Sequence, residues 1–478
     1  MMTPEIEVEK LFKQILPNTR FENKAFAVGG YVRDEVMGLE SKDLDIVVEI
    51  DKGSEDLAKL LHTMFGESVS TPRQMGANYP IWQITFKENV TRVGRIFETK
   101  GAIVEFADTM TESFPDIYSR QRITKFGTLD DDVKRRDFTV NMLLKDLTIG
   151  KIIDPSGKGI EDIKEGVIRC HPEVFTDEIF SADPLRMMRM IRFSCKYNWT
   201  IDFTTGLSAT FMSERIKVVS NERIMEELEK IMKIGKLYEA IKKMDECNLL
   251  EHILPEVKAL QAIEQAHEAT NHHKEGNAYN HTILVLKHAE ATVVGQLSAL
   301  FHDIGKATTQ VIEDDKISFL KHEDVGADLT MVIMRRLKYD VDTITKVATL
   351  VRNHMRPHHL SRRKASIKAI RKLVREIGEE LVHPLLNLSE ADCLGNYPVD
   401  NTTVLLRERV IEVMNSPIKI RKQPILNGHE IMELLDIKPS PMISKVGKFL
   451  LDVEDEMCED GEELDKELAN ELVKMRFK

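Results

Sequence analysis

The chain has 478 residues, with 67 Lys plus Arg against 79 Asp plus Glu, which gives a formal net charge of −12. This length exceeds one ordinary hydrophobic core and predicts several domains. Hydrophobic residues make up 42% and charged residues 31%, which favours a folded, helix-rich protein over a disordered or fibrous one. The acidic balance excludes a general polycation, so nucleic-acid binding requires a local basic surface.

The cysteines and the N-terminal segment indicate the compartment. The five cysteines are scattered without a CxxC pair, which argues against a disulfide framework or a thiolate zinc site. The opening MMTPEIEVEKLFKQIL is acidic and amphipathic, unlike a signal peptide, and no stretch approaches the roughly 20 apolar residues that span a bilayer. We expect a cytoplasmic protein with no membrane association and no obligate protein partner.

Short apolar runs in the first part of the chain predict strands at 25–30, 44–50, 80–86 and 102–108. After DPSGKG, which ends at residue 159, the apolar spacing becomes helical. We therefore predict an α/β N-terminal domain followed by all-α regions. The expected domains are 1–155, 156–260, 261–400 and 401–478, and the last three are helical.

A glycine pair lies where the first predicted strand gives way to a helix. Gly29 and Gly30 follow AFAV, and the helix is expected to begin near Tyr31. Glycines at such a turn let backbone N–H groups approach phosphate oxygens closely, and the helix N-terminus adds favourable partial charge. Arg33, one turn into that helix, can reach the same anion. The pattern predicts a phosphate-binding turn.

Two aspartates belong to the next predicted strand. Asp43 and Asp45 are two residues apart, so strand alternation places both carboxylates on one face. Paired carboxylates beside a phosphate site suit Mg²⁺-dependent phosphoryl or nucleotidyl transfer, because the metal bridges phosphate oxygens and lowers the pKa of the attacking hydroxyl. Glu105, in AIVEFAD, is the candidate for a third carboxylate across the sheet.

These segments resemble the active-site signature of a known family. GGYVRD at 29–34 and KDLDIVV at 42–48 are similar to the signature of the tRNA nucleotidyltransferase / bacterial poly(A) polymerase family. Further family motifs are matched, in the family's order, at 135–141, 154–169, 183–193 and 220–231. In the first of these, RRDFTVN, the resemblance implies that Arg136, Asp137 and Asn141 contact the ribose and phosphates of the incoming nucleotide. An Arg-Asp ion pair at a strand-to-helix corner is the structural alternative.

A row of polar residues on the helix that begins near 183 can read a base. Helical spacing places Asp183, Arg186 and Arg189 near one side, with Arg192 extending the row. A carboxylate accepts hydrogen bonds and a guanidinium donates them, so an Asp/Arg pair can accept cytosine and adenine and reject uracil and guanine. The family resemblance implies this role for Asp183 and Arg186 in place of a template strand. The alternative is an amphipathic helix with solvated arginines.

A second set of residues matches the HD phosphohydrolase signature. His281, His302 with Asp303, and Asp392 follow the order H…HD…D, and their side chains suit Mg²⁺, Mn²⁺, Ni²⁺ or another divalent ion. The resemblance extends here to tRNA nucleotidyltransferases with an appended HD domain. His322 and His354 are candidates for binding a substrate phosphate or a second metal.

Three charged segments occur towards the C-terminus. The basic stretches 361–376 and 419–423 can contact the phosphates of a tRNA acceptor arm, although a solvated face is the alternative for each. The acidic run 452–467 predicts a solvated helix face or tail.

The family resemblance implies an N-terminal palm with a sheet of the five-stranded type at 1–155, a helical nucleotide-selecting neck at 156–260, an HD metal-binding domain at 261–400 and a helical C-terminal region at 401–478. It also implies an enzyme that adds CCA to the 3′ end of tRNA from CTP and ATP and releases pyrophosphate. Mg²⁺ is expected at the palm, and phosphohydrolase activity on 2′,3′-cyclic or nucleotide phosphates at the HD site. A poly(A) polymerase, or a CC- or A-adding enzyme on the same scaffold, is a close alternative. A different class of alternative is an HD phosphohydrolase whose N-terminal half only binds RNA.

Overall fold

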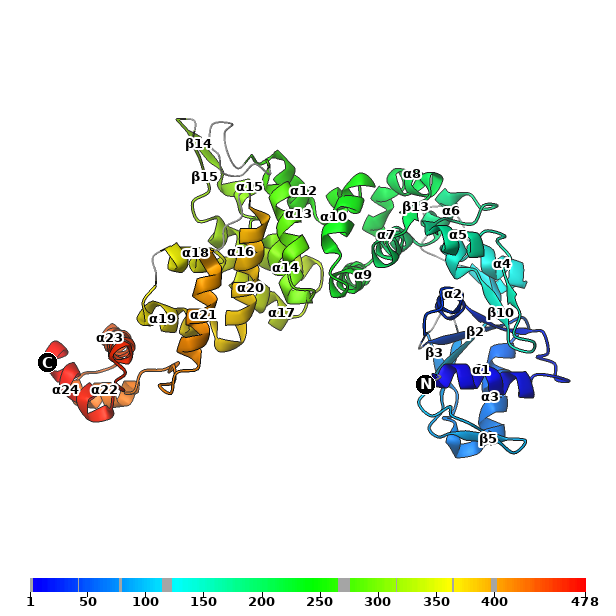
Figure 1. The fold of residues 1–478 in the computed structure, drawn as a ribbon, viewed down its shortest axis with the longest axis horizontal. Helices are drawn as coiled ribbons and strands as arrows, with labels where there is room; N and C mark the ends of the chain where they lie inside the picture. Colours follow the sequence, from blue (N-terminus) through cyan, green and yellow to red (C-terminus); the bar gives the residue numbers. More distant parts are fainter. Residues whose placement is uncertain are drawn as a thin grey trace. The chain divides into compact units, whose positions relative to one another are not determined.

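The computed structural model describes residues 3–41, 43–76, 80–113, 123–264, 276–314, 316–362, 365–396 and 402–478. Two compact units divide the chain (Figure 1): Met1–Ser220 with Glu246–His252, and Asn221–Asp245 with Ile253–Lys478. The division at Ser220 falls inside the predicted neck, and the four-domain scheme stays a prediction. No described helix is long and apolar enough to cross a membrane.

A mixed sheet of seven strands organises the first unit. The strand order is β11-β10-β1-β2-β7-β4-β3. β2 and β7 are parallel, whereas the other neighbouring strands are antiparallel. All four predicted strands are present, and three short strands make the sheet larger than the five-stranded type. The bounds are β1 (Ala25–Val28), β2 (Leu44–Val48), β3 (Arg73–Met75), β4 (Ile81–Thr85), β7 (Ile103–Asp108), β10 (Leu144–Asp146) and β11 (Ile152–Ile153).

The N-terminal helix α1 packs against this sheet. Its apolar residues recur at helical spacing and are buried, and the rings of Phe12 and Phe106 meet edge to face with centroids 6.3 Å apart. Two further strand pairs, β5 (Val90–Arg92) with β6 (Arg95–Phe97) and β8 (Met110–Ser113) with β9 (Ile123–Phe126), lie outside the main sheet. The helices of this region are α1 (Pro4–Ile15), α2 (Gly30–Val36), α3 (Gly53–Phe65), α4 (Leu129–Lys134) and α5 (Gly159–Glu165).

Helices complete the first unit after the sheet. In α7 (Leu185–Tyr197) the Met and Ile residues are buried, whereas the arginines remain partly exposed, as the amphipathic pattern predicts. A short parallel pair, β12 (Val167–Ile168) with β13 (Thr200–Ile201), interrupts the helical pattern. The remaining elements are α6 (Thr176–Ala182), α8 (Phe203–Phe211), the 3₁₀ helix η3 (Ser213–Val218) and α11 (Leu250–Ile253).

The second unit is helical, apart from the hairpin β14 (Val311–Glu313) and β15 (Lys316–Ser318). The helical segment at 221–244 is divided into two helices at Gly235, which has a φ of 67°. The fold class predicted from the sequence is thus confirmed. The helices up to residue 395 are α9 (Asn221–Lys233), α10 (Leu237–Glu246), α12 (Pro255–Ala259), α13 (Ala278–His288), α14 (Val293–Phe301), α15 (Lys306–Thr309), α16 (His322–Arg336), α17 (Val341–Asn353), α18 (Met355–Arg362), α19 (Ile367–Ile377) and α20 (Glu379–Gly395).

The C-terminal helices bury a small apolar core of their own, which includes Ile431, Val446, Leu450 and Val473. Asn427 begins α22 with a capping box to Glu430, which satisfies backbone donors of the first turn. The helices are α21 (Thr402–Met414), α22 (Gly428–Leu435), α23 (Pro441–Met457) and α24 (Lys466–Phe477).

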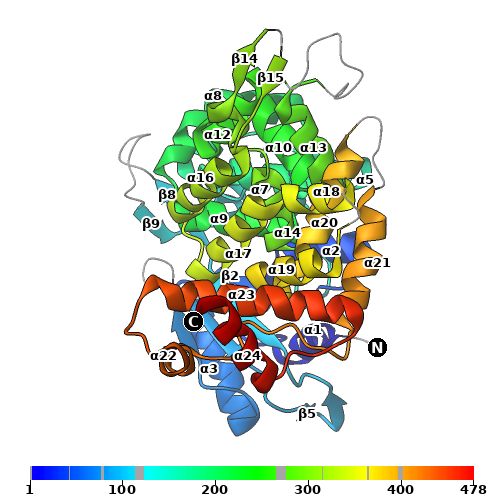
Figure 2. The same ribbon diagram turned by 90° about the vertical axis from the view of Figure 1, so that its left-hand side faces the viewer.

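Ion pairs join the predicted acidic run to one of the basic stretches. Helices α19 and α23 pack against each other (Figure 2), and the fully buried Arg371 donates to Asp455 over 2.8 Å and to Glu454 over 3.3 Å. Arg375 also donates to Asp455, at 2.6 Å. The prediction of a solvated acidic face is therefore wrong at Glu454 and Asp455, because a distant basic helix neutralises them. For the same reason Arg371 is not available to a tRNA phosphate.

Candidate active site and metal centre

A lateral row of three polar residues crosses the centre of the sheet. In the strand register Asp45 of β2 lies opposite Glu105 of β7, and Glu105 lies opposite Gln83 of β4. The Gln83 amide donates a hydrogen bond of 2.8 Å to one Glu105 oxygen. Asp43 precedes Asp45 by two residues and comes just before β2, so it belongs to the same face. The sheet therefore brings the three predicted carboxylates together.

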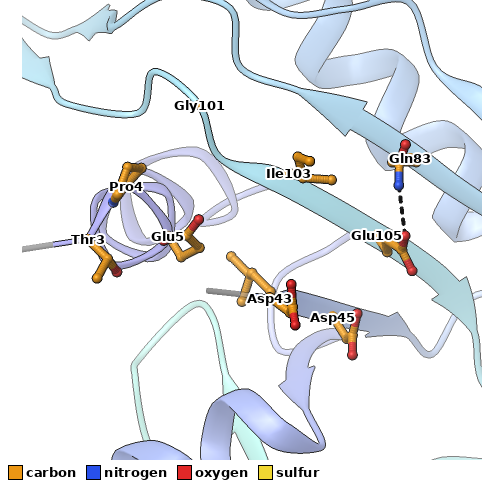
Figure 3. Close-up of a pocket in the computed structure, with 10 residues that line it drawn as sticks. Thr3, Pro4, Glu5, Asp43, Asp45, Gln83, Gly101, Ile103 and Glu105 are labelled. Carbon is orange, nitrogen blue, oxygen red and sulfur yellow. Dashed lines mark hydrogen bonds between the residues drawn. The ribbon is translucent and has the colours of Figure 1, made fainter. Parts of the chain in front are cut away.

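These carboxylates line a pocket of about 630 Å³ (Figure 3). The wall opposite the row is formed by the start of α1, where the Glu5 side chain extends towards Asp43. Enclosure by the protein, together with the Glu105 and Asp43 carboxylates, raises the pKa of Asp45 to about 6, in opposition to the Arg136 guanidinium. An all-oxygen donor set that repels itself in this way fits a hard divalent cation such as Mg²⁺.

The predicted phosphate-binding turn has the backbone that only glycine adopts readily. Gly29 has a φ of 66° and precedes α2, which begins at Gly30. A Cβ atom on Gly29 would lie 3.8 Å from a terminal nitrogen of Arg136, so the turn and this guanidinium are neighbours. Arg136 is also held by two hydrogen bonds to one oxygen of the buried Asp132, at 2.8 and 3.1 Å.

Arg33 lies beside the predicted phosphate-binding turn, since a Cβ atom on Gly30 would lie 3.5 Å from a terminal nitrogen of its guanidinium. Its guanidinium is buried, donates to Asn141 over 2.7 Å and to Asp34 over 2.6 Å, and stacks near the rings of Phe193 and Tyr197. Its contact with a nucleotide phosphate stays a prediction. In the structure, Arg33 connects α2 to the segment that contains RRDFTVN.

Asp137 is the centre of the same network. Arg189 of α7 donates two hydrogen bonds to one oxygen of Asp137, at 2.6 and 2.8 Å, and the Asn141 amide donates to the other oxygen over 3.0 Å. Burial alone would raise the pKa of Asp137, but Arg189, Asn141 and Arg186 lower it to about 2. The chain Arg189–Asp137–Asn141–Arg33 thus links the predicted base-reading helix to the helix that follows the phosphate turn.

The two predicted base readers lie at the start of α7. Asp183 ends α6, and one of its carboxylate oxygens accepts the backbone N–H of Leu185 over 3.2 Å. Arg186 donates to the carbonyl oxygens of Ile179, at 3.1 Å, and Arg135, at 2.6 Å, which fixes its guanidinium plane. Arg192, further along α7, stacks on the ring of Phe193 with 4.4 Å to the centroid. Base recognition by these residues remains a prediction.

The HD residues of the second unit form two adjoining groups of potential metal ligands. One consists of His281, His302 and Asp392, and the other of Asp303, His322 and His354, with all ligand atoms of each group within 4.8 Å of one another. One Asp303 oxygen lies 3.2 Å from His302 Nε2, and the other lies 3.4 Å from His322 Nε2. Asp303 therefore lies between the two groups.

Hydrogen bonds to the main chain orient three of these imidazoles. The Nδ1 atoms of His302, His322 and His354 lie 2.7–2.9 Å from the carbonyl oxygen three residues earlier. This contact assigns the proton to Nδ1 and leaves each Nε2 lone pair for a metal ion. Burial and the neighbouring His302 lower the pKa of His354 to about 3, whereas the pKa of Asp303, despite its burial, is held well below its usual range by His302 and Lys306. Burial alone would lower the pKa of His302, but the Asp303 and Asp392 carboxylates raise it. Mn²⁺ or Ni²⁺ requires neutral imidazole and ionised carboxylate, so a metal ion at His302 would displace a proton.

Close helix packing places Asp303. A Cβ atom on Gly305 would lie 2.1 Å from the His322 carbonyl oxygen and 2.8 Å from the Gly326 nitrogen. Glycine in HDIGK is thus required for the approach of α16, which delivers His322 to Asp303.

Several site residues escaped the sequence-based prediction. Asp132 accepts hydrogen bonds from Arg135 and Arg136. Because it precedes them by three and four residues, helical spacing could have predicted these ion pairs. Gln83 carries no signal until the register of β4 is known. His358, whose Nε2 lies 2.9 Å from Asp392, was present in the histidine-rich segment RNHMRPHH but is distinguished only by its contact.

Family models match three segments of the chain. They are the poly A polymerase head domain at residues 25–169, the probable RNA and SrmB-binding site of polymerase A at 199–261, and the HD domain at 278–396. The first covers the carboxylate row and the phosphate turn, and the last covers all the potential HD ligands.

Similar proteins span nearly the whole chain. The CC-adding tRNA nucleotidyltransferase of Thermus thermophilus is 26% identical over 90% of this chain and 90% of its own, and the A-adding tRNA nucleotidyltransferase of Deinococcus radiodurans is 29% identical over 67% and 74%. The crystal structure of the Bacillus stearothermophilus CCA-adding enzyme in complex with CTP shares the fold, with a TM-score of 0.64, 19% identity and coverage of 100% of this chain and 98% of that one. The chain thus matches a poly A polymerase head domain followed by an HD domain, and it is similar to tRNA nucleotidyltransferases over most of its length.

Proposed function

We propose that the protein adds CCA to the 3′ end of tRNA from CTP and ATP, without a nucleic-acid template, and releases pyrophosphate. The observation that carries this proposal is the row of Asp45 and Glu105, with Asp43 on the same face, beside the Gly29 turn. Three carboxylates that face one pocket repel one another and do not stabilise a sheet, so their grouping indicates a binding role. The similarity to tRNA nucleotidyltransferases supports the reaction class.

The head residues have distinct roles in this reaction. Asp43, Asp45 and Glu105 hold Mg²⁺, which lowers the pKa of the tRNA 3′-hydroxyl and neutralises charge on the triphosphate when bound. Gln83 fixes one oxygen of Glu105 and so directs the other. The Gly29–Gly30 turn and Arg136 receive the phosphates, because backbone N–H groups and a guanidinium are both donors.

Base selection falls to the start of α7. Asp183 accepts the exocyclic amine of cytosine or adenine, and Arg186 donates to the neighbouring ring nitrogen. The two carbonyl contacts of Arg186 hold its guanidinium in one plane, so uracil and guanine, which present the reverse pattern, meet like groups. Arg189 supports this helix through Asp137.

The experiment that tests the proposal uses tRNA transcripts that lack one, two or all three terminal CCA nucleotides. Each is incubated with Mg²⁺ and CTP, ATP, UTP or GTP, and the products are sequenced, with Asp45→Ala as the inactive control. Completion of CCA followed by arrest is expected. Long A tails would identify a poly(A) polymerase, and arrest after CC, or addition of A alone, would identify the partial activities named in the two relatives.

A second activity is favoured by the paired ligand groups of the HD domain. We propose that this site binds Mg²⁺, Mn²⁺ or Ni²⁺ and hydrolyses phosphate esters such as 2′,3′-cyclic phosphates at damaged RNA ends. The shared carboxylate of Asp303 supports a site for two ions. Hydrolysis of 2′,3′-cyclic AMP with each metal tests it, and retention of activity in His302→Ala/Asp303→Ala would contradict it. If the wild-type protein hydrolyses phosphate esters but adds no nucleotide to tRNA, it is instead an HD phosphohydrolase whose N-terminal half only binds RNA.

The proposed partners are the tRNA acceptor arm, CTP and ATP. We place the reaction in the cytoplasm, since the five cysteines, all within the described residues, are buried and form no disulfide, as in a reducing compartment.

A further inference from the structure

Three acidic residues on the N-terminal helix α1 are buried: Glu5, Glu7 and Glu9. Glu9 accepts hydrogen bonds from Lys145, at 2.7 Å, and from the Tyr31 hydroxyl, at 3.0 Å. Glu7 pairs with Lys10 at 2.7 Å. Each of these two carboxylates therefore has a cation from the chain itself, as buried charges require.

Glu5 differs from the other two. It is 6% exposed, and within the described parts of the chain its carboxylate has neither a hydrogen bond nor an ion pair. Instead it lines the pocket of the carboxylate row and extends towards Asp43 (Figure 3). A carboxylate on a residue this enclosed, with no cation from the described chain and with its oxygens open to the pocket, is stabilised by a cation that enters that pocket.

The charge in the pocket indicates what that cation is. Glu5, Asp43, Asp45 and Glu105 bring four carboxylates to one cavity, and Gln83 occupies only one of their oxygens. In nucleotidyl transfer, two divalent ions would balance these four charges. The aspartates of one strand and the glutamate of its neighbour line one side of the pocket, while Glu5 approaches from the opposite wall.

We propose that Glu5 is a metal-binding residue of the head site and holds a divalent cation, or its bound water, jointly with Asp43. This inference rests on the proposed metal-dependent transfer and adds a ligand from outside the sheet. It also assigns a role to α1, which would close the metal site and not only cover the sheet.

The test compares Mn²⁺ binding and Mg²⁺ activation in the full-length protein. Glu5→Gln keeps the shape and removes the charge, and Glu7→Gln is the matched control from the same helix with a similar degree of burial. We expect Glu5→Gln to weaken one Mn²⁺ site about tenfold in an electron paramagnetic resonance titration and to raise the Mg²⁺ concentration for half-maximal CTP addition similarly. Glu7→Gln is expected to change neither.

Two further variants make the outcome decisive. Glu5→Asp retains the charge on a shorter side chain and is expected to give an intermediate affinity, which also serves if Glu5→Gln does not fold. Unchanged Mn²⁺ affinity in both Glu5 variants, while Asp45→Asn removes a site, would overturn the role of Glu5 alone. If Asp45→Asn also leaves all Mn²⁺ sites intact, both the role of Glu5 and the proposed metal-dependent transfer at the head site are contradicted.

Discussion

The acidic side chains of the head pocket and those of the α19–α23 contact differ in what balances their charge. Glu454 and Asp455 are enclosed by Arg371 and Arg375, so the chain supplies its own counter-charge. In the head, Asp43, Asp45 and Glu105 face a pocket together, and their mutual repulsion helps to raise the pKa of Asp45. Acidic side chains that pair with arginines of the chain, such as Asp455, therefore stabilise the fold. Acidic side chains that face the head pocket are instead available to bind a cation from solution.

The largest effect that separates the two regions is expected for Asp45→Asn. Loss of one carboxylate from the row is expected to lower CTP addition by at least about 10³-fold, on the scale that metal-stabilised charge contributes. The free energy of unfolding without metal is expected to stay unchanged or to rise, because a repulsive charge is removed. Single-turnover addition and urea unfolding measure the two quantities. Glu55→Gln, at a half-buried site on α3 away from the carboxylate row, is the control.

A reciprocal result is expected for Arg371→Ala. The change leaves Glu454 and Asp455 without the guanidinium that they enclose, and it is expected to lower the free energy of unfolding by about 3–5 kcal/mol. CTP addition at a temperature where the protein is folded is expected to persist. Lys372→Ala, exposed on the same helix, is the comparison, and an equal loss from both variants would remove the contrast.

The HD site combines the two arrangements, because its aspartates contact imidazoles of the chain and these imidazoles are themselves potential metal ligands. His358→Ala removes the contact that orients Asp392 and is expected to weaken Mn²⁺ affinity about 10–100-fold. Equilibrium dialysis measures it, with His383→Ala, exposed on α20, as the control. Full affinity in His358→Ala would mean that Asp392 needs no orienting partner.

The smallest effect concerns Asp137, an acid of the head that is paired within the chain. Its pKa is lowered to about 2, so its contribution to stability is present above the unfolded-state pKa of about 3.9 and is lost as the pH falls towards 2. The contribution is on the order of 2 kcal/mol. We expect the stability difference between wild type and Asp137→Asn to shrink between pH 4 and pH 2. Asp130→Asn, at an exposed position nearby, is expected to show no such window.

Local patterns were sufficient to predict much of the candidate site. Strand alternation brought Asp43 and Asp45 to one face, and the order of the HD residues predicted a cluster that the structure forms around Asp303. These predictions succeed because residues within one element have fixed spacing. The four main strands and the helical second half followed from the same periodicities.

Contacts between distant elements could not be predicted in this way. Gln83 depends on the register of β4 against β7, and Glu5 depends on where α1 packs. The acidic run was expected to be solvated because its sequence does not reveal that α19 brings two arginines to it. The hydrogen bond from Arg33 to Asn141, 108 positions later, likewise could not be predicted from local spacing.

The hydrogen-bonded chain from Arg189 through Asp137 and Asn141 to Arg33 has a consequence for fidelity. Because it couples α7 to α2, a mutation within the chain displaces the base-reading surface and the phosphate turn together. A selection for variants that accept UTP or GTP at full speed would therefore recover changes at Asp183 or Arg186, which lie at the edge of the network, and would discard changes at Asp137. Mutations at Asp183 or Arg186 would thus change the error rate without changing turnover, whereas mutations at Asp137 would change both.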